Sequence, residues 1–502
     1  MKILFYRYGS ICEPDIIDGF CELGNEVVTI TEEIYNKNLL PSEGVALLNE
    51  TLQKASYDFV FSINFYPFIS EVCNIFQIRY LCWTVDSPVM ELYSDSIRNP
   101  WNRIFLFDRA QYNEFSRYNP SCIFHLPLAS NPTRWKKVIS SATDDDISRF
   151  SGDISFVGSL YTEKSPYDRL KKEPGYLTGY LEGIMAAQLK VYGYNFLEEI
   201  LPDSLVEEFR NSLEGFYTPP TGFRRNDRAT MAQLYLGAKV TAMERLWLMQ
   251  TLGSKYSVNL YTASDTTGLP VHNCGLAKTL TEMPLIFHFS RINLNPTAKS
   301  IRTGLPLRLF DVLACEGFLL TNYQSELTDY FTPGQELECY TGEDDLLSKT
   351  EYYLTHENDR KEIAHNGYLA ADLVQESNLS MMAYIGQKLW LNNYEWKDRI
   401  KEGSTSDILE VLKAMDKEVR YQAEESMKML IDEQMDSNKI SGKVLNKVNY
   451  VNDWAVRLRE ELGRKPTVKE VAERMGVSED VVSEALSLSA DKIEDIKVQN
   501  EK

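Results

Sequence analysis

The stretch DISFVGSLYTEK, residues 153–164, decides the fold class. Its apolar run, 154–157, stops at a glycine and leads into an amphipathic segment, which is the pattern of a strand, a turn and a helix. Five earlier apolar runs have the same setting, at residues 3–6, 27–30, 58–63, 79–84 and 103–107. Strands that alternate with helices are typical of parallel sheets covered on both faces. The sequence therefore predicts an α/β protein.

A polar stretch at residues 131–152 separates two such series. Its Ser-Ser pair and its run of three aspartates are typical of a linker. We predict two doubly wound, Rossmann-like domains that face a cleft, one over residues 1–135 and one over 150–395. The second domain is expected to contain a mostly helical insertion between 158 and 258, strands at 258–261, 292–295 and 318–321, a helix near 306–315 and a closing helix at 379–394.

Beyond residue 400 the sequence becomes charged and helical, with few aromatic residues. We predict an all-α extension over 400–502 with a helix-turn-helix at about 455–488. Thr467 and Ser478 are good N-caps, and Glu470 follows Thr467 by three residues, as in a capping box. Gly476 can end the first of the two helices in the left-handed conformation.

The net charge argues against one class of partner. The 502 residues include 53 Lys and Arg against 73 Asp and Glu, a formal net charge of −20. General binding to nucleic acid needs a basic face, so we do not expect nucleic acid as the main partner. Eight cysteines without a CxxC pair or a Cys/His cluster predict free thiols and no metal site. Because no stretch approaches the roughly 20 apolar residues of a membrane span, we expect a cytoplasmic protein.

The cleft between two doubly wound sheets suits a nucleotide diphosphate, because helix N-termini at the strand ends favour anions without a metal. The first candidate phosphate loop holds Gly158, which lets the backbone approach a ligand, and Lys164, which can place a charge on a phosphate. An ordinary strand-to-helix turn with a surface lysine is the alternative interpretation.

The second candidate is KSIRTGLPLRLFD, residues 299–311, where cations and a Gly-x-Pro helix start lie together. Arg302, Gly304 and Arg308 would serve the phosphates. Asp311 lies one helical turn after Arg308, where a carboxylate can accept hydrogen bonds from two ribose hydroxyls. The alternative is a solvated basic patch in which Arg308 and Asp311 pair along the helix.

Six segments in order carry a resemblance: RYGSICEPD at 7–15, WTVDSP at 83–88, IFLFDR at 104–109, SFVGSL at 155–160, the block 292–321 and IAHNGY at 363–368. Together they resemble group 1 glycosyltransferases of the GT-B fold, and more closely the branch that is similar to spore maturation protein B. The resemblance covers residues 1–395. It implies a bacterial enzyme that moves a sugar from a nucleotide-sugar donor to an acceptor hydroxyl, without a metal or a cofactor.

The resemblance also implies donor-binding roles. The residues concerned are Gly9, Gly158, Lys164, Arg302, Gly304, Arg308, Asp311 and Glu316. The arginine of the family's Gly-Arg-Leu loop is Ser159 here, so Arg302 or Arg308 would take over its part. The acidic residue that holds the ribose falls on Asp311. Where the branch has Cys-Gly-Gly, this chain has a glutamate, Glu316, which either contacts the donor or is merely tolerated.

The acceptor hydroxyl needs a general base within hydrogen-bond reach, expected from the first domain. Asp86 directly follows a strand, Asp15 follows the loop after the first strand, and His125 lies near the end of the domain. Their other interpretations are an Asx-turn or N-cap for Asp86, an N-cap for Asp15 and a packed or linker histidine. Two carboxylates flanking a glycosidic bond would instead indicate a hydrolase.

The tail resembles a different family. LREELGRKPTVKEVAERMGV, from residue 458, looks like the third conserved region of bacterial sigma factors. Residues 441–502 hold 11 Lys and Arg against 12 Asp and Glu, so they lack the basic footprint of a DNA reader. We expect the tail to bind a protein, such as a protein acceptor. The alternative for the whole chain is a catalytically weak, sugar-nucleotide-binding regulatory or adaptor protein that acts through its helix-turn-helix tail.

Overall fold

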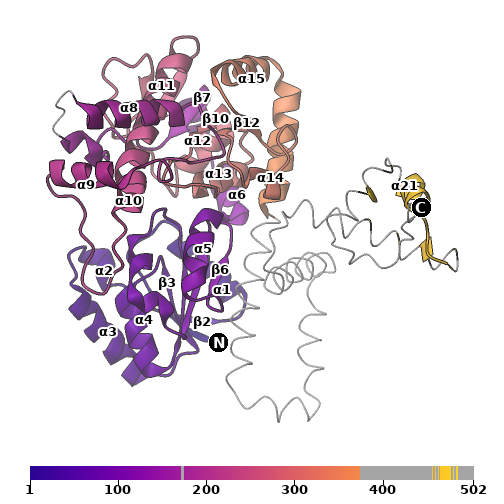
Figure 1. Ribbon diagram of the computed structural model, residues 1–502. Coiled ribbons are helices and arrows are strands. Elements are labelled where there is room, and N and C mark those ends of the chain that lie inside the picture. Colours follow the sequence, from indigo (N-terminus) through magenta and orange to yellow (C-terminus); the bar gives the residue numbers. More distant parts are fainter. Residues whose placement is uncertain are drawn as a thin grey trace, which may run out of the picture. The chain divides into compact units, whose positions relative to one another are not determined.

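The computed structural model describes residues 1–170, 175–372 and parts of the segment 451–483, including 464–475. The chain divides into two compact units, Met1–Ala423 and Glu424–Lys502. Two α/β domains make up the described part of the first unit (Figure 1). Over the described residues, no helix is both long and apolar enough to cross a bilayer. The closing helix expected at 379–394 lies outside the described residues.

The first sheet consists of six parallel strands. They are β1 (Lys2–Tyr6), β2 (Glu26–Ile30), β3 (Phe59–Ile63), β4 (Arg79–Trp83), β5 (Asn102–Leu106) and β6 (Ile123–His125). Their order is β2-β1-β3-β4-β5-β6. The five strands predicted in this region are confirmed, and β6 is additional. The order reverses between β1 and β3, the kind of switch point at which a ligand crevice opens.

Helices cover this sheet, so that β3 and β4 are buried along their whole length. The covering elements are α1 (Glu13–Glu22), α2 (Glu32–Tyr35), α3 (Pro41–Lys54), α4 (Pro67–Phe76), α5 (Arg109–Phe115) and three 3₁₀ turns, η1 (Met90–Tyr93), η2 (Asp95–Arg98) and η3 (Ser116–Tyr118). Continuous apolar runs such as β3 are therefore central strands rather than half-exposed ones.

The second sheet is also parallel and six-stranded. Its strands are β7 (Gly152–Val157), β8 (Val258–Tyr261), β9 (His272–Asn273), β10 (Ser290–Asn295), β11 (Leu319–Asn322) and β12 (Glu338–Tyr340). The order β12-β11-β10-β7-β8-β9 is that of a dinucleotide-binding fold, with its switch point between β7 and β10. The accompanying helices are α12 (Met283–Phe289), α13 (Leu307–Ala314), α14 (Leu327–Tyr330) and α15 (Glu343–Thr355).

The segment 131–152, which was predicted to link the domains, connects the two sheets through two helices. They are α6 (Pro132–Ser140) and α7 (Asp144–Phe150). The polar residues that indicated a linker are helix caps: Asn131 accepts from the N–H of Arg134, and Thr143 forms a capping box with Asp146. Trp135 and Phe150 anchor the two helices in the core.

The predicted helical insertion is confirmed and has a core of its own. It contains η4 (Pro166–Arg169), α8 (Tyr176–Gln188), α9 (Asp203–Ser212), α10 (Asp227–Thr230), the π-helical η5 (Met231–Leu236) and α11 (Gly237–Gly253). Between α9 and α10 the chain reaches down to the first domain (Figure 1). There the N–H of Arg224 donates to Tyr93 O and the N–H of Asp95 donates to Gly222 O, each over 2.8 Å. We call residues 213–226 the arm.

The second unit contains the helix α21 (Val468–Met475). The predicted capping box is confirmed: the N–H of Glu470 donates to Thr467 Oγ1 over 3.3 Å, and the N–H of Thr467 donates to the Glu470 carboxylate over 2.8 Å. A small apolar cluster that includes Val451, Val471 and Val482 lies beside it. Gly476 and Ser478, on which the helix-turn-helix prediction depends, lie outside the described residues.

Candidate functional site

The loop after β1 is organised by one buried carboxylate. Oε1 of Glu13 accepts the N–H groups of Tyr8, Gly9 and Ser10 over 2.8–3.1 Å, and its Oε2 lies 2.9 Å from Arg7 Nε. Glu13 is fully buried. Three N–H donors in sequence form the kind of concavity that binds anions. In this domain the carboxylate of Glu13 fills the concavity, so the N–H of Gly9 already has an acceptor and is not available to a ligand.

Asp86 lies exposed at the end of β4, beside the switch point of the first sheet. Its carboxylate accepts a hydrogen bond from Asn64 Nδ2 over 2.7 Å, and the same nitrogen lies 3.3 Å from Tyr8 Oη. Burial, aided by the charge of Asp86, raises the pKa of Tyr8, so its hydroxyl stays protonated. The ends of β1, β3 and β4 thus bring together an available carboxylate and two neutral polar groups.

Asp15 and Asp311 line one partly open pocket between the two domains. Its walls are largely apolar and include Trp83 and Met283. Burial raises the pKa of Asp15 to about 6, against the opposing charge of Arg134 and with a further rise from Asp311. Burial also raises the pKa of Asp311, against the effects of Arg308 and Ser130. Two acids with raised pKa values in one pocket mark a candidate functional site.

Arg308 and Asp311 pair along α13, with Nη1 3.4 Å from Oδ2. Ser130 Oγ donates to the other carboxylate oxygen over 2.9 Å, so Asp311 is held from both domains. Arg308 also contacts the sulfur of Met283. The pairing matches one part of the alternative interpretation, but the patch is not solvated, because Asp311 is buried. Since a carboxylate has about four acceptor positions, Asp311 retains capacity for a ligand hydroxyl.

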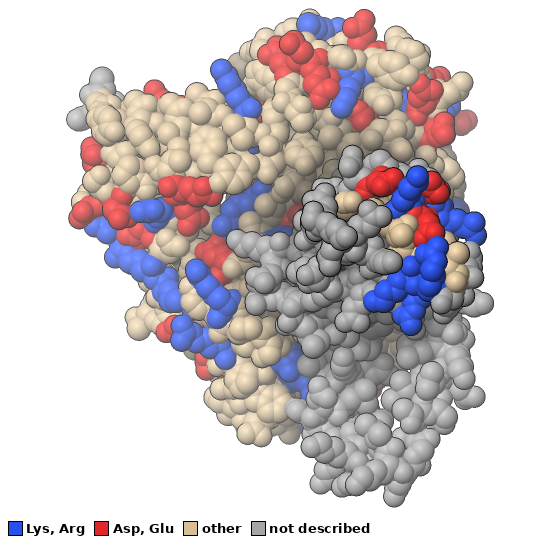
Figure 2. All heavy atoms as spheres, turned by 45° about the vertical axis from the view of Figure 1, so that its right-hand side comes forward, with Lys and Arg blue, Asp and Glu red and all other residues tan. Residues whose placement is uncertain are grey.

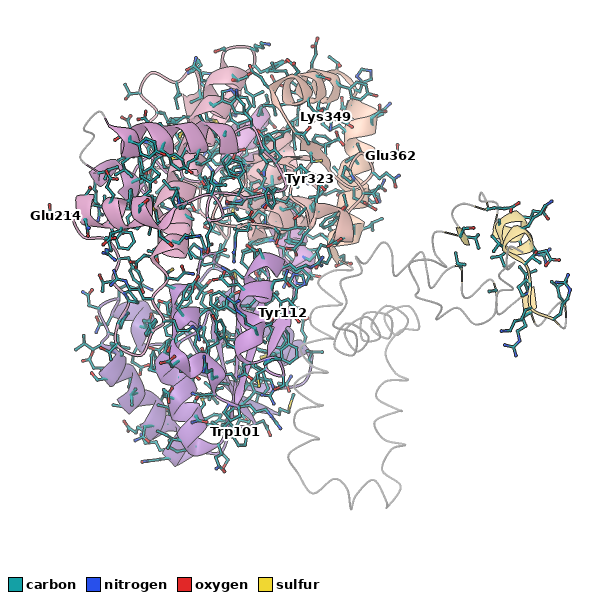
Figure 3. All side chains as sticks on the ribbon, in the orientation of Figure 1. Trp101, Tyr112, Glu214, Tyr323, Lys349 and Glu362 are labelled. Carbon is teal, nitrogen blue, oxygen red and sulfur yellow. The ribbon has the colours of Figure 1, made fainter. Side chains whose placement is uncertain are left out.

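His125 joins the domains rather than standing free in the cleft. Its Nε2 lies 2.9 Å from the carboxylate of Glu326, which follows β11. Burial alone would raise the pKa of Glu326, but hydrogen bonds from His125, Thr303 and the N–H of Arg109 hold it below its usual value. Tyr112 on α5, labelled in Figure 3, has its ring 6.2 Å from the His125 ring.

The loop after β10, residues 296–306, is bound to the first domain by Asp108. This buried carboxylate accepts from the N–H of Arg302 over 2.7 Å and from the hydroxyl of Thr303 over 2.8 Å. Gly304 allows the approach, because a Cβ there would lie 2.8 Å from the Cα of Asp108. The guanidinium of Arg302 pairs with Glu114 on α5 over 2.6 Å.

The switch point of the second sheet holds a buried cation that the sequence analysis missed. Arg245, on α11, donates to the carbonyl of Ser159 after β7 over 2.6 Å and to the carbonyl of Pro296 after β10 over 2.8 Å. It is 9% exposed, and its Nε has no hydrogen-bond partner. Among the described residues, no carboxylate forms an ion pair with it, since the adjacent Glu244 pairs with Lys299. A charged pair inside an apolar helix was the available signal.

Gly158 and Lys164 flank this switch point. Gly158 follows β7, and its N–H donates to the carbonyl of Tyr261 over 3.1 Å. Lys164 is exposed, with its ammonium 5.5 Å from the centre of the Tyr161 ring. Ser159, in the place of the family's arginine, donates its hydroxyl to Glu163 over 2.6 Å. Gly158 and Arg245 therefore meet at this edge, and Lys164 lies in solvent beside it.

Glu316 lies at the other end of α13, about 12 Å along the helix from its start. Its φ of 55° is the left-handed conformation, which favours glycine at a helix end. The carboxylate pairs at the surface with His365 over 2.7 Å. This placement favours a residue tolerated at a helix end over a donor contact.

Comparison with known proteins identifies two segments. Residues 245–378 match the family model described as "Glycosyl transferase-like", and residues 446–493 match "Sigma-70 region 3". The second domain contains a glycosyltransferase-like region. No curated protein matches the chain.

Similar solved structures have low sequence identity. A glycosyltransferase from Rickettsia africae is 10% identical, with a TM-score of 0.42, over 78% of this chain and 99% of that one. Anabaena Alr3699/HepE in complex with UDP is 12% identical, with a TM-score of 0.42, over 77% and 100%. The sucrose-phosphate synthase of Thermosynechococcus elongatus is 10% identical, with a TM-score of 0.45, over 78% and 100%.

The glycosyltransferase-like region begins at Arg245 and contains the loop after β10 and helix α13. It thus includes Arg302, Arg308 and Asp311, whereas Gly158 and Lys164 precede it. In the described residues, no group of three or more His, Cys, Asp or Glu side chains is arranged to hold a metal ion.

Proposed function

We propose that this chain transfers a glycosyl group from a nucleotide-sugar donor to an acceptor hydroxyl, in the bacterial cytoplasm and without a metal. The observation that carries the proposal is the buried Arg245 at the β7/β10 switch point, inside the segment that matches a glycosyltransferase family. A cation without an acidic partner, placed where doubly wound sheets bind ligands, suits a diphosphate. The closer relationship to the branch similar to spore maturation protein B is part of the same proposal.

Three of the candidate residues have roles in this proposal. Asp311 accepts the ribose hydroxyls, and Arg308 orients its carboxylate. Asp86 takes the proton of the acceptor hydroxyl as that oxygen bonds to the anomeric carbon. The bond from this carbon to the diphosphate oxygen breaks, and the nucleoside diphosphate leaves with the electron pair. Positioning and charge stabilisation supply most of the catalysis in such a scheme.

A second candidate is a sugar-nucleotide-binding regulatory or adaptor protein with weak catalysis. It is favoured by Asp108, which already occupies the N–H of Arg302 and the hydroxyl of Thr303, and by the His125–Glu326 contact between the domains. Contacts between side chains of the two domains oppose opening of the cleft, which a donor would need in order to enter. In this version the tail would contact a protein partner.

Thermal unfolding of the full chain with UDP-, GDP-, ADP- and dTDP-sugars tests donor binding. A true donor at 100 times its Kd adds about 2.7 kcal/mol to the free energy of unfolding. Asp311→Ala should weaken that donor by roughly 10- to 150-fold, the value of a charged hydrogen bond. The exposed Asp344→Ala serves as the matched control. Equal affinities in the two variants would remove Asp311 from the site.

Donor hydrolysis separates the two candidate functions, because a transferase slowly passes its sugar to water and a sensor does not. Asp86→Asn should lower that rate by roughly 10²–10⁴-fold with little change in donor affinity. Binding without any turnover in the unmodified protein would favour the regulatory alternative.

The tail is proposed to bind a protein, including a protein acceptor, rather than nucleic acid. Residues 441–502 hold 11 Lys and Arg against 12 Asp and Glu, so they carry no excess of positive charge. Figure 2 shows both basic and acidic side chains among the described residues on the face that it draws. Tight binding of the full chain to duplex DNA, with a steep salt dependence, would contradict this assignment.

A further inference from the structure

A second cavity lies between α5 of the first domain and the helical insertion. It is partly open, with a volume of about 460 Å³, and is distinct from the pocket of Asp15 and Asp311. We call it the polar chamber. Its lining includes Glu114, Asn195, Glu198, Arg228, Gln233 and Arg302. Among the described residues that line it, Ala232 alone is apolar.

The charges of the polar chamber cancel. Three arginines and three glutamates line it. Arg302 lies 2.6 Å from Glu114 and 4.0 Å from Glu198, and Arg228 pairs with Asp203 over 2.5 Å. A phosphorylated ligand would face the glutamates, and a cation would face the arginines. The balance therefore favours a ligand without net charge.

The lining also excludes a flat apolar ligand, because it contains no aromatic ring. What it offers is planar groups with paired donors or acceptors: guanidinium, carboxylate and carboxamide. Gln233 Nε2 makes one long contact, 3.3 Å, with Glu198, and Nε of Arg302 is buried without a partner. Such groups match the neighbouring hydroxyls of a saccharide, where each hydroxyl both donates and accepts.

Arg302 connects the polar chamber to the loop after β10. Arg302 lies in the loop after β10, and its backbone N–H donates to Asp108 of the first domain. The side chain of Arg302 lines the chamber. The arm, which binds the first domain through Arg224, belongs to the same insertion as Glu198 and Gln233. A ligand in the chamber would therefore contact both domains and the loop that leads to α13.

We propose that the polar chamber binds a neutral saccharide, at a site separate from Asp86, which is not among its lining residues. Glu198 and Gln233 would hydrogen-bond its hydroxyls. Arg302 would contact the saccharide through its side chain and so couple saccharide binding to the loop after β10.

The test is ligand-observed NMR titration of the full chain, without nucleotide. The probes are glucose, galactose, N-acetylglucosamine and their β-1,4-linked disaccharides, with glucose 6-phosphate as the charged counterpart. We expect at least one neutral saccharide to bind and Glu198→Gln and Gln233→Leu each to weaken it about tenfold. Glu208→Gln, an exposed glutamate on α9 outside the chamber, should leave binding unchanged. Circular dichroism confirms folding, and the nearly isosteric Glu198→Gln remains informative where Gln233→Leu does not fold.

Three results would overturn the proposal: no binding of any neutral probe, tighter binding of glucose 6-phosphate, or equal losses in Glu198→Gln and Glu208→Gln. Failure of the transferase function gives a different result. In that case donor hydrolysis is absent while saccharide binding and its loss in Glu198→Gln persist.

Discussion

The two sheets share their parallel architecture, yet their switch points are filled in opposite ways. In the first domain the N–H groups after β1 are used by the buried carboxylate of Glu13. In the second domain the edge between β7 and β10 is backed by the buried guanidinium of Arg245, which has carbonyl oxygens as partners. Parallel topology creates a crevice in both, and the charge beside it decides which one can receive a diphosphate.

The largest expected change in the free energy of unfolding comes from a substitution in the first domain. Glu13→Ala leaves three N–H donors and the cation of Arg7 without their acceptor, so the free energy of unfolding should fall by about 3–5 kcal/mol. Urea denaturation measures it. Glu22→Ala, at an exposed position of the same helix, should change stability by less than about 0.5 kcal/mol. Similar losses in both variants would mean that Glu13 does not organise the loop.

The pH dependence of stability tests whether the carboxylate of Asp15 is buried in the cleft. Burial raises its pKa from 3.8 to about 6 in the folded protein. Its contribution to stability is therefore fully present below pH 3.8 and is lost as the pH rises through 6. Asp15→Asn should increase the free energy of unfolding by up to about 3 kcal/mol at pH 8, with the gain fading towards pH 4.

The measurement is urea unfolding of Asp15→Asn at pH 4, 6 and 8. Asp18→Asn, exposed on the same helix, should show no comparable gain at pH 8. A gain for Asp15→Asn that is independent of pH would contradict the assignment of the effect to the buried carboxylate.

A substitution of Arg245 tests whether its charge contributes to diphosphate binding. Arg245→Met should weaken UDP, GDP or ADP, whichever binds, by about tenfold and leave the matching nucleoside nearly unaffected, because only the diphosphate carries the charge. Isothermal titration of both ligands separates charge from structure. Lys255→Met, an exposed cation just after α11, is the control. Equal losses for nucleotide and nucleoside would reduce Arg245 to a structural role.

The smallest effect should come from Lys164, which lies in solvent beside the same edge. Lys164→Ala should weaken UDP, GDP or ADP, whichever binds, by about two- to fivefold at low salt, and the loss should shrink in 0.5 M NaCl because exposed charges are screened. The Arg245→Met effect should persist in the same salt. If the two variants respond alike to salt, the contrast between a buried and an exposed cation fails.

The longer strands could be read from the sequence because each is a continuous apolar run with a turn at its end. The predicted runs at 3–6 and 292–295 lie within β1 and β10. The strands β6, β9 and β12 have only two or three residues, too short for a periodic pattern. The two helices in segment 131–152 were not predicted, because helix caps and linkers use the same polar residues.

The candidate site was only partly accessible from the sequence. Asp15 and Asp311 were both named, but not their meeting in one pocket. Arg245 was missed although Glu244 and Arg245 interrupt an apolar helix, because such a pair does not show which loops the helix packs against. Asp108 and Glu326 were missed because their partners are distant: the carboxylate of Asp108 binds the N–H of Arg302, 194 residues away.

By itself the sequence determined the α/β class, the two parallel series, the helical insertion and the capping box of Thr467, because periodicity and capping are local properties. Tertiary structure alone decided which charges meet at the cleft. Buried ion pairs and hydrogen bonds depend on chain segments brought together by the packing of the two sheets, and no local pattern encodes the side chain that a distant loop supplies.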